Sequence, residues 1–222
     1  MNSHQHSDPY EAQRERMVRN QIEARGIDHP LVLKAVRETP RHLFIPQEMH
    51  PMAYADKPLP IGYNQTISQP YIVAYMTQCL RLVGGERVLE VGTGLGYQAA
   101  VLSRIASEVY TVERLPELAE KARELLDKLG YDNVFVSCGD GTLGWPEKAP
   151  FDGIIATASG PSVPESFREQ LRVGGRIVMP VGSHRLGQDI LRLTKGRSGE
   201  LQEERLLGVA FVPMVGEQGW KE

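Results

Sequence analysis

Three glycines at alternate positions, placed just after an acid, are the residues of this sequence best suited to chemistry. An apolar run that contains Glu90 leads into Gly92, Gly94 and Gly96, and a helical pattern starts at Tyr97. A strand, a glycine turn and a helix in this order are typical of a nucleotide-cofactor loop, because glycine lets the backbone approach a ligand closely. The same pattern also fits a strand-to-helix turn without a ligand.

The acids distinguish between the possible cofactors. Glu90 would repel a pyrophosphate, whereas it suits a cation such as the sulfonium or amino group of S-adenosylmethionine. Glu113 ends the next predicted strand about twenty residues after the glycines, where a ribose needs a hydrogen-bond acceptor. NAD sites share that second acid. Together, the two acids favour S-adenosylmethionine as the ligand and argue against a strand-to-helix turn that binds no ligand.

Two further segments lie where a ligand of such a fold would bind. Asp140 and Gly141 follow the third predicted strand, and Asp140 could accept a hydrogen bond from an adenine amino group; an Asx turn explains it equally well. Ser68 precedes a predicted helix, so it suits an N-cap, and its hydroxyl could also bind an acceptor beside the cofactor. Asp152 stands before an apolar run, and we interpret it as structural.

These residues need a scaffold, and the sequence predicts a doubly wound, mainly parallel α/β sheet, because strand and helix patterns alternate. The predicted strands are 87–91, 109–113, 133–137, 152–157, 175–180, 189–194 and 206–215, and the predicted helices are 9–25, 29–37, 69–81, 97–106, 116–129 and 164–172. Five prolines from Pro40 to Pro60 exclude a regular helix and indicate an ordered loop over the core.

Length and composition limit the class of protein. A chain of 222 residues with 41% hydrophobic content can bury one sizeable core. We therefore expect a disordered tail over 1–8 and a single domain over 9–222, which consists of N-terminal helices and a loop (9–83), a cofactor-binding core (84–182) and extra C-terminal strands (183–222). A net charge of −3 and scattered basic residues argue against nucleic-acid binding.

Cysteines and apolar runs suggest no metal site and no membrane segment. Cys79 and Cys138 have no metal-ligand spacing, so we expect two buried free thiols and no metal. No apolar run is long enough to span a bilayer, and the N-terminus lacks the pattern of a secretory signal. These features predict a cytoplasmic protein, and we expect it to be a monomer.

A wider set of motifs resembles one family. The segment Leu59–Tyr71, LPIGYNQTISQPY, precedes the glycine loop, and MPVG and FVP follow it at 179–182 and 211–213. Together they resemble protein-L-isoaspartate O-methyltransferases over roughly residues 17–216. The glycine loop occurs in many methyltransferases, whereas TISQP placed before it is close to specific. The resemblance implies a Rossmann-like enzyme that uses S-adenosylmethionine to methylate the carboxylate of isoaspartyl residues in damaged proteins and peptides, which initiates repair.

The resemblance also implies roles for individual residues. Ser68 matches the catalytic serine, and Val212 and Pro213 match a strand of the peptide site. We also expect a set of residues to contact the cofactor: the positions that match the family's cofactor contacts, and the other glycines of the loop. They are Gln65, Thr66, Ile67, Ser68, Glu90, Gly92, Gly94, Gly96, Glu113, Asp140 and Gly141. Leu95 replaces a usual small residue, and Ala210 replaces a frequent basic residue, which could alter peptide preference.

The implied reaction needs no general base from the protein. The residues also have to be weighed against other functions. A carboxylate with a pKa of about 4 is ionised at neutral pH, so no general base is needed. A NAD-dependent dehydrogenase is disfavoured by Glu90. A nucleic-acid amino-methyltransferase is disfavoured because Ser68–Tyr71 matches its motif poorly and no basic face is evident. A methyltransferase with a small-molecule acceptor and a non-catalytic binding module stay open.

Overall fold

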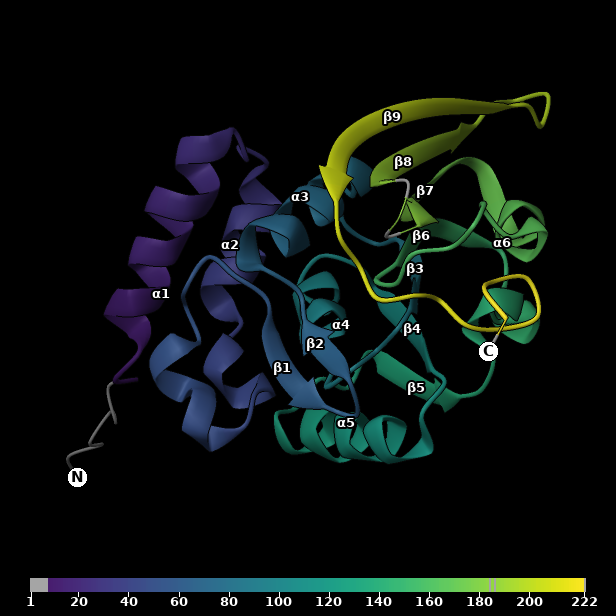
Figure 1. Cartoon of the computed structure of the whole chain (residues 1–222). Coiled ribbons are helices and arrows are strands. Elements are labelled where there is room, and N and C mark those ends of the chain that lie inside the picture. The colour runs from purple at the N-terminus through teal and green to yellow at the C-terminus, as the bar shows by residue number, and fades with distance from the viewer. Residues whose placement is uncertain (1–7, 184, 186, 222) are drawn as a thin grey trace.

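A seven-stranded sheet forms the centre of the structure, a computed structural model that describes residues 8–183, 185 and 187–221 (Figure 1). Its strands are β3 (Arg87–Val91), β4 (Glu108–Glu113), β5 (Val134–Cys138), β6 (Phe151–Ala156), β7 (Leu171–Ser183), β8 (Gly187–Lys195) and β9 (Leu201–Val209). They lie in the order β5-β4-β3-β6-β7-β8-β9, in which β3 to β7 are parallel and β8 and β9 antiparallel. The predicted doubly wound, mainly parallel sheet is therefore confirmed.

The order of the strands fixes where a ligand can bind. From β3 the chain passes outward to β4 and β5, and it then returns to the other side of β3 to add β6 and β7. Val91 pairs with Val112 on one side and with Ala156 on the other, so these strands end at the same edge. Open parallel sheets bind ligands at this carboxyl edge, at the point where the strand order reverses. In this sheet that point lies between β3 and β6.

Both faces of the sheet are covered, because the strands alternate apolar side chains between two clusters. Residues of one face, including Val88 and Ile155, pack with the helices α3 (Pro70–Leu80) and α4 (Tyr97–Ser103). Residues of the other face, including Leu89 and Ile154, pack with α6 (Glu165–Gln170). The helix α5 (Pro116–Lys128) packs along β4 and β5. The core holds the strand ends in fixed positions.

The N-terminal segment forms helices where the sequence predicts them. The first predicted helix contains α1 (Glu11–Met17), a π-helical turn over Val18–Ile22 and a 3₁₀ turn over Glu23–Arg25. Gly26 ends it with a φ of +87°. The next helix is α2 (Pro30–Glu38). Of the predicted tail, residues 1–7 lie outside the described residues, and Asp8 accepts hydrogen bonds from the Tyr10 amide and the Arg14 guanidinium.

The proline-rich segment is ordered but contains more structure than a loop. It forms 3₁₀ turns over Arg41–Phe44 and Gln47–Met52, and then a hairpin of β1 (Leu59–Gly62) and β2 (Gln65–Ile67). Tyr63 and Asn64 make the turn with φ of +54° and +56°. The hairpin was not predicted, because Pro60 lies within β1 and strands of only three or four residues give little β pattern.

The C-terminal prediction needs correction. The predicted strand 206–215 is wrong in extent, since β9 starts at Leu201 and ends at Val209. Residues 210–215 leave the sheet and run back across its carboxyl edge, where Pro213 bridges to Ser159 (Figure 1). Alternating hydrophobicity does not distinguish an extended strap from a strand. Cys79 is buried as predicted, but Cys138 is exposed at the end of the edge strand β5.

Candidate functional site

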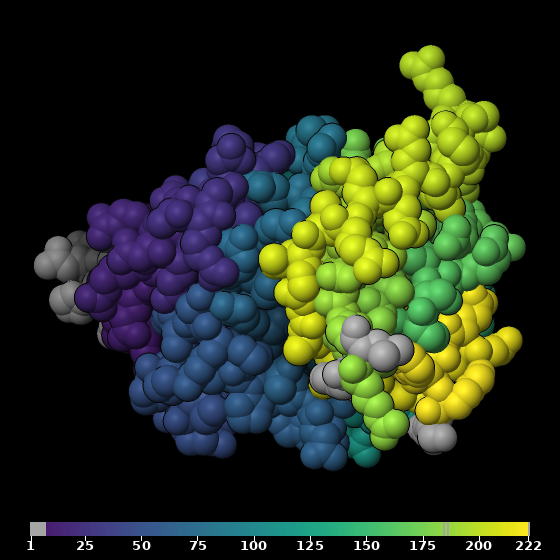
Figure 2. Space-filling model, turned by 45° about the horizontal axis from the view of Figure 1, so that its top comes forward, coloured from purple at the N-terminus to yellow at the C-terminus, as the bar shows by residue number. Residues whose placement is uncertain are grey.

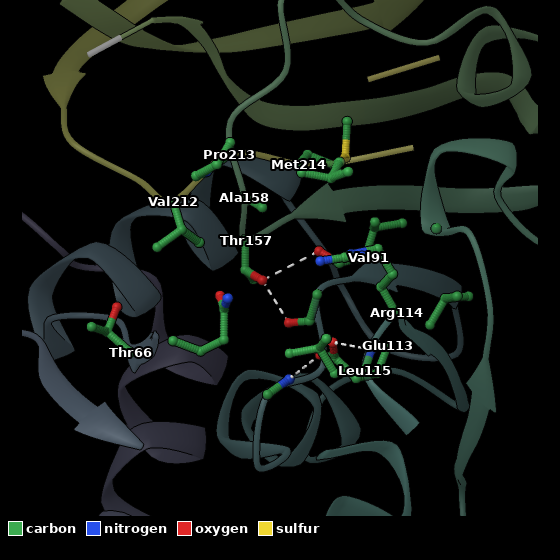
Figure 3. Close-up of a pocket in the computed structure, with 16 residues that line it drawn as sticks. Thr66, Val91, Glu113, Arg114, Leu115, Thr157, Ala158, Val212, Pro213 and Met214 are labelled. Atoms are coloured by element: carbon green, nitrogen blue, oxygen red, sulfur yellow. Dashed lines mark hydrogen bonds between the residues drawn. The ribbon is translucent and has the colours of Figure 1, made fainter. Parts of the chain in front are cut away.

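The carboxyl edge of the sheet carries a cavity of about 660 Å³, here called the central cavity (Figure 3). Residues that follow β3, β4, β5 and β6 form its walls, and the hairpin and the C-terminal strap, residues 210–221, cover it. Its lining residues are Gln65, Thr66, Val91, Gly92, Gly94, Val112, Glu113, Arg114, Leu115, Gly141, Thr157, Ala158, Val212, Pro213, Met214 and Val215. The cavity therefore lies at the edge where open α/β sheets bind their ligands.

The glycine loop forms one wall of the central cavity, and its glycines serve different purposes. Gly92 has a φ of +98°, and a Cβ there would lie 2.3 Å from the Thr157 hydroxyl oxygen. Its place therefore requires glycine. Gly96 does not line the cavity; a Cβ there would meet the Leu126 side chain of α5 at 3.0 Å. Gly96 thus lets α4 and α5 pack closely, and it was predicted as a cofactor contact.

Glu113 lies at the end of β4, as predicted, and it lines the central cavity beside the glycine loop. Its carboxylate accepts a hydrogen bond from the Gly94 amide at 2.9 Å and another from the Leu115 amide at 3.0 Å. Two backbone donors on either side fix the orientation of the carboxylate. The adjacent lining residues Arg114, Leu115, Thr157 and Ala158 were not predicted, because no pattern marks a residue that merely follows a strand.

Glu90 lies beneath the glycine loop and not in the central cavity, so the structure does not show the predicted direct approach to a cationic ligand. The side chain is fully buried; Thr111 donates a hydrogen bond to Oε2 at 2.6 Å, and Oε1 has no partner among the described residues. Burial raises the pKa of Glu90 to about 8, and the negative charge of Glu113 acts in the same direction. A buried carboxyl without a cation is more stable when protonated.

Asp140 forms the predicted Asx turn, and its carboxylate also holds the C-terminal strap. Oδ1 accepts from the Thr142 amide at 2.8 Å and from its hydroxyl at 2.6 Å, while Oδ2 accepts from the Glu217 amide at 2.7 Å. Burial alone would raise the pKa of Asp140, but these hydrogen bonds outweigh it and lower the pKa. Gly141 lines the central cavity, where a Cβ would lie 2.5 Å from Val91.

Ser68 lies between β2 and α3, and the prediction that it caps the helix is wrong. The N-cap is Gln69, and no side chain makes a capping hydrogen bond. Among the described residues, no partner is found for the Ser68 hydroxyl, which leaves it available to a ligand. Ser68 lines two more spaces, an inner cavity of about 390 Å³ behind the glycine loop and an outer groove of about 720 Å³.

The outer groove is built by two segments that lie far apart in the sequence. It is lined by Pro58, Thr66, Ser68, Gln69, Ile72, Thr157, Gly208, Val209, Ala210, Phe211 and Val212. All of these residues are uncharged. Figure 2 shows the N-terminal part of the chain, in blue, beside the C-terminal strands, in yellow. The walls of the outer groove are therefore neutral and partly apolar.

Buried polar contacts hold the C-terminal strap in place. Gln188 of β8 accepts from the Phe211 amide at 2.6 Å and donates to the Phe211 carbonyl at 3.1 Å. Ser159 donates from its amide to the Val212 carbonyl and accepts from the Met214 amide, each at 2.8 Å. These bonds place Val212 and Pro213 over the central cavity, as Figure 3 shows.

The structure brings together most of the predicted site. The predicted residues that line the central cavity are Gln65, Thr66, Gly92, Gly94, Glu113, Gly141, Val212 and Pro213. Ile67 and Ser68 line the inner cavity. Glu90, Gly96 and Asp140 lie outside all three of these spaces. No group of three or more metal-ligating side chains occurs within 8–183, 185 and 187–221, and no helix in that part of the chain is long and apolar enough to cross a membrane.

Comparison with known proteins gives one family. The model of the protein-L-isoaspartate(D-aspartate) O-methyltransferase family matches residues 12–219. Protein-L-isoaspartate O-methyltransferase 1 of Rhodopseudomonas palustris is 54% identical over 211 residues, which are 95% of this chain and 86% of the relative. Protein-L-isoaspartate O-methyltransferase 2 of Pelobacter propionicus is 55% identical over 210 residues, 95% and 93% of the two chains.

Solved structures agree with the fold. A protein-L-isoaspartate O-methyltransferase superposes with a TM-score of 0.83 at 32% identity, and the match covers 93% of this chain and 67% of that one. A second, from Plasmodium falciparum and in complex with S-adenosyl-L-homocysteine, gives a TM-score of 0.79 at 23% identity, covering 91% and 98%. The second similarity concerns the fold alone.

Proposed function

Because the chain belongs to the protein-L-isoaspartate(D-aspartate) O-methyltransferase family, we propose that it transfers the methyl group of S-adenosylmethionine to the carboxylate of isoaspartyl residues in damaged proteins and peptides. This reaction initiates repair of the altered residue. One observation carries the proposal at the level of the site: the central cavity adjoins an uncharged groove at Thr66, Thr157 and Val212, so a donor and a peptide have neighbouring places.

The central cavity offers hydrogen-bonding groups that suit S-adenosylmethionine. Gly92 and Gly141 both line this cavity, and a Cβ at either position would collide with another lining side chain, Thr157 or Val91. Glu113 presents a fixed carboxylate at the end of β4, where it can accept from the hydroxyls of a ribose. The bound donor supplies a methyl group on a cationic sulfur. Glu90, buried under the loop, becomes the natural counter-charge if it gives up its proton.

The acceptor carboxylate is a competent nucleophile without help from a base. With a pKa of about 4 it is ionised at neutral pH. The described residues that line the inner cavity and the outer groove accordingly contain no His, Asp, Glu, Lys or Arg. We propose that the Ser68 hydroxyl donates a hydrogen bond to one carboxylate oxygen, which orients the other oxygen toward the methyl group of the donor. Orientation and exclusion of water then supply most of the rate.

Two features of the groove serve this role. Its neutral walls remove the acceptor carboxylate from water without offering a competing cation. Val212, held by Gln188 and Ser159 through the strap backbone, lines the groove where it meets the central cavity. The acceptor carboxylate and the sulfonium of the donor both lose their charge as the methyl group is transferred. A poorly hydrated site favours this loss of charge.

The cellular setting belongs to the same proposal. We propose a monomeric protein of the cytoplasm that does not bind nucleic acid. The net charge of −3 and a groove without basic residues support the last point, because nucleic-acid binding depends on basic side chains. Size-exclusion chromatography with light scattering measures the oligomeric state directly, and a dimer would contradict this part of the proposal.

The experiment that tests the reaction is transfer of labelled methyl from S-adenosylmethionine to a peptide with one isoaspartyl residue, beside its aspartyl twin. We expect label in the isoaspartyl peptide alone, as a base-labile ester. Binding of S-adenosylhomocysteine, measured by calorimetry, accompanies the assay. Cofactor binding without labelling of either peptide would refute the acceptor and indicate a methyltransferase for another class of substrate.

A further inference from the structure

Two residues line all three spaces of the site, and this locates the place where they meet. Thr66 and Thr157 both line the central cavity, the inner cavity and the outer groove. Val212 lines the central cavity and the outer groove. In Figure 3, Thr66 and Val212 lie on one side of the view and Glu113 on the other, with Thr157 between them. The three residues frame an aperture between the donor and acceptor sides.

Each residue of this aperture comes from a different part of the fold. Thr66 belongs to the hairpin strand β2, Val212 to the C-terminal strap, and Thr157 directly follows β6. Thr157 therefore stands at the point where the strand order reverses, next to the end of β3. Of the three residues, it alone is part of the central sheet's edge.

The hydrogen bonds of Thr157 connect the aperture to the glycine loop. Its amide donates to the Val91 carbonyl at 2.9 Å. Its hydroxyl oxygen lies 2.6 Å from the Gly92 carbonyl and 3.2 Å from the Val91 carbonyl, so the single proton goes mainly to Gly92. The Gly92 amide in turn donates to the Val112 carbonyl at 2.9 Å. Both peptide groups of Gly92 are thus fixed, one of them by the Thr157 side chain.

On the basis of the proposed function, we propose that methyl transfer takes place at the aperture framed by Thr66, Thr157 and Val212, and that Thr157 is a positioning residue for it. By holding the Gly92 carbonyl, the Thr157 hydroxyl fixes the glycine loop relative to the opening of the outer groove. The donor then lies in line with the acceptor carboxylate. Displacement by about 1 Å at such a step can cost about 10²-fold in rate.

The contact has an energetic basis as well. A hydroxyl that donates to a backbone carbonyl contributes about 1 kcal/mol, and its loss leaves the carbonyl without that donor. The remaining Thr157 amide bond and the sheet itself keep the strand ends together. Loss of the hydroxyl should therefore move the loop slightly without unfolding the protein. Loss of the hydroxyl should therefore affect the position of the bound donor more than the affinity for it.

Thr157→Val is the decisive variant, because it keeps the shape and removes the hydroxyl. We expect kcat for isoaspartyl peptide methylation to fall about 10- to 100-fold, while the Kd of S-adenosylhomocysteine changes by less than about threefold. Thr157→Ser restores the hydroxyl and should return kcat to within about threefold of wild type. Thr39→Val is the matched control, since the Thr39 hydroxyl also donates to a backbone carbonyl, Ala35, but lies outside the site.

A second measurement does not depend on the acceptor. The ¹³C-methyl resonance of labelled S-adenosylmethionine bound to the protein reports where the methyl group lies. We expect this resonance to move in Thr157→Val and to return in Thr157→Ser. An unchanged resonance in both variants would overturn the inference, as would an unchanged kcat. Failure of the wild-type protein to label the isoaspartyl peptide would instead refute the proposed function, and the resonance would still decide the role of Thr157.

Discussion

The donor side and the acceptor side of the site are built in opposite ways. The donor side uses the ends of neighbouring parallel strands, and it depends on backbone atoms at Gly92, Gly94 and Gly141. The acceptor side uses the β1–β2 hairpin and the C-terminal strap, and it depends on the Ser68 hydroxyl and on uncharged walls. Donor-side changes should therefore act on cofactor affinity, whereas acceptor-side changes should act on turnover and on peptide binding.

Gly92→Ala should give the largest effect, on the donor side. At a φ of +98° an alanine is strained, and its Cβ would lie 2.3 Å from the Thr157 oxygen. We expect the Kd of S-adenosylhomocysteine, measured by calorimetry, to rise about 100-fold or more. Gly94→Ala is the control, because its φ of +57° is accessible to alanine at moderate cost and its nearest neighbour is the Ile61 Cδ1 at 3.2 Å. Equal losses in the two variants would contradict this reasoning.

Ser68→Ala should show the opposite pattern, because it lies on the acceptor side. A hydrogen bond to a charged group contributes about 1.5 to 3 kcal/mol, so kcat should fall about 10- to 100-fold. The Kd of S-adenosylhomocysteine should stay within about threefold of wild type. Ser103→Ala is the control, since Ser103 donates to the Ala100 carbonyl in α4, away from the groove. A large loss of cofactor affinity in Ser68→Ala would remove Ser68 from the acceptor side.

Gln188→Ala should raise the KM for the peptide about 10-fold, because it leaves the buried Phe211 amide and carbonyl without their partner. The strap then holds Val212 less firmly at the outer groove. Cofactor affinity should change less than peptide KM, since the sheet ends stay intact. Gln202→Ala, at an exposed position of β9, serves as the control in the same steady-state assay. An unchanged KM would show that the strap does not need this anchor.

Glu90→Gln should act on stability and not directly on substrate binding, and only at higher pH. The pKa of Glu90 is raised to about 8 in the folded protein from an ordinary value of 4.5, so the folded state binds the proton more tightly than the unfolded state. Its contribution to stability is complete below about pH 4.5 and is lost as pH rises toward 8. Relative to Glu90→Gln, the wild-type free energy of unfolding should fall by up to about 1.4 kcal/mol per pH unit in that window.

Urea unfolding of both proteins at about pH 5 and about pH 8 checks this prediction. Glu124→Gln, at an exposed position of α5, is the matched control for removal of a carboxyl. A difference between wild type and Glu90→Gln that stays constant over the window would mean that the Glu90 carboxyl is ionised in the free protein.

The donor side could be predicted from the sequence because its signals are local. The apolar run before Gly92, the glycine spacing and the acid at the next strand end lie close together in the chain, and the sheet places them as expected. Glu90 shows the limit of such reasoning. Its position in the chain is clear, but whether a strand residue faces a cavity or the core depends on the layer packed against it.

The acceptor side was predictable only where the resemblance to a family supplied residues. Ser68 looked like a helix cap, yet the backbone places the cap at Gln69. Val212 looked like part of a long strand, yet it lies on a strap. Thr157 has no local signal, because its role arises from the meeting of β3 and β6 with two distant segments. Contacts between distant segments leave no periodic pattern in a sequence.

The hairpin and the strap are far apart in the sequence, and this separation affects how the active site forms during folding. Ser68 and Val212 line the same groove although every strand from β3 to β9 lies between them in the chain. Contacts of such high sequence separation form late in folding. Recovery of methyl transfer during refolding should accordingly lag behind recovery of helical and strand signal, which makes activity a specific reporter of the completed molecule.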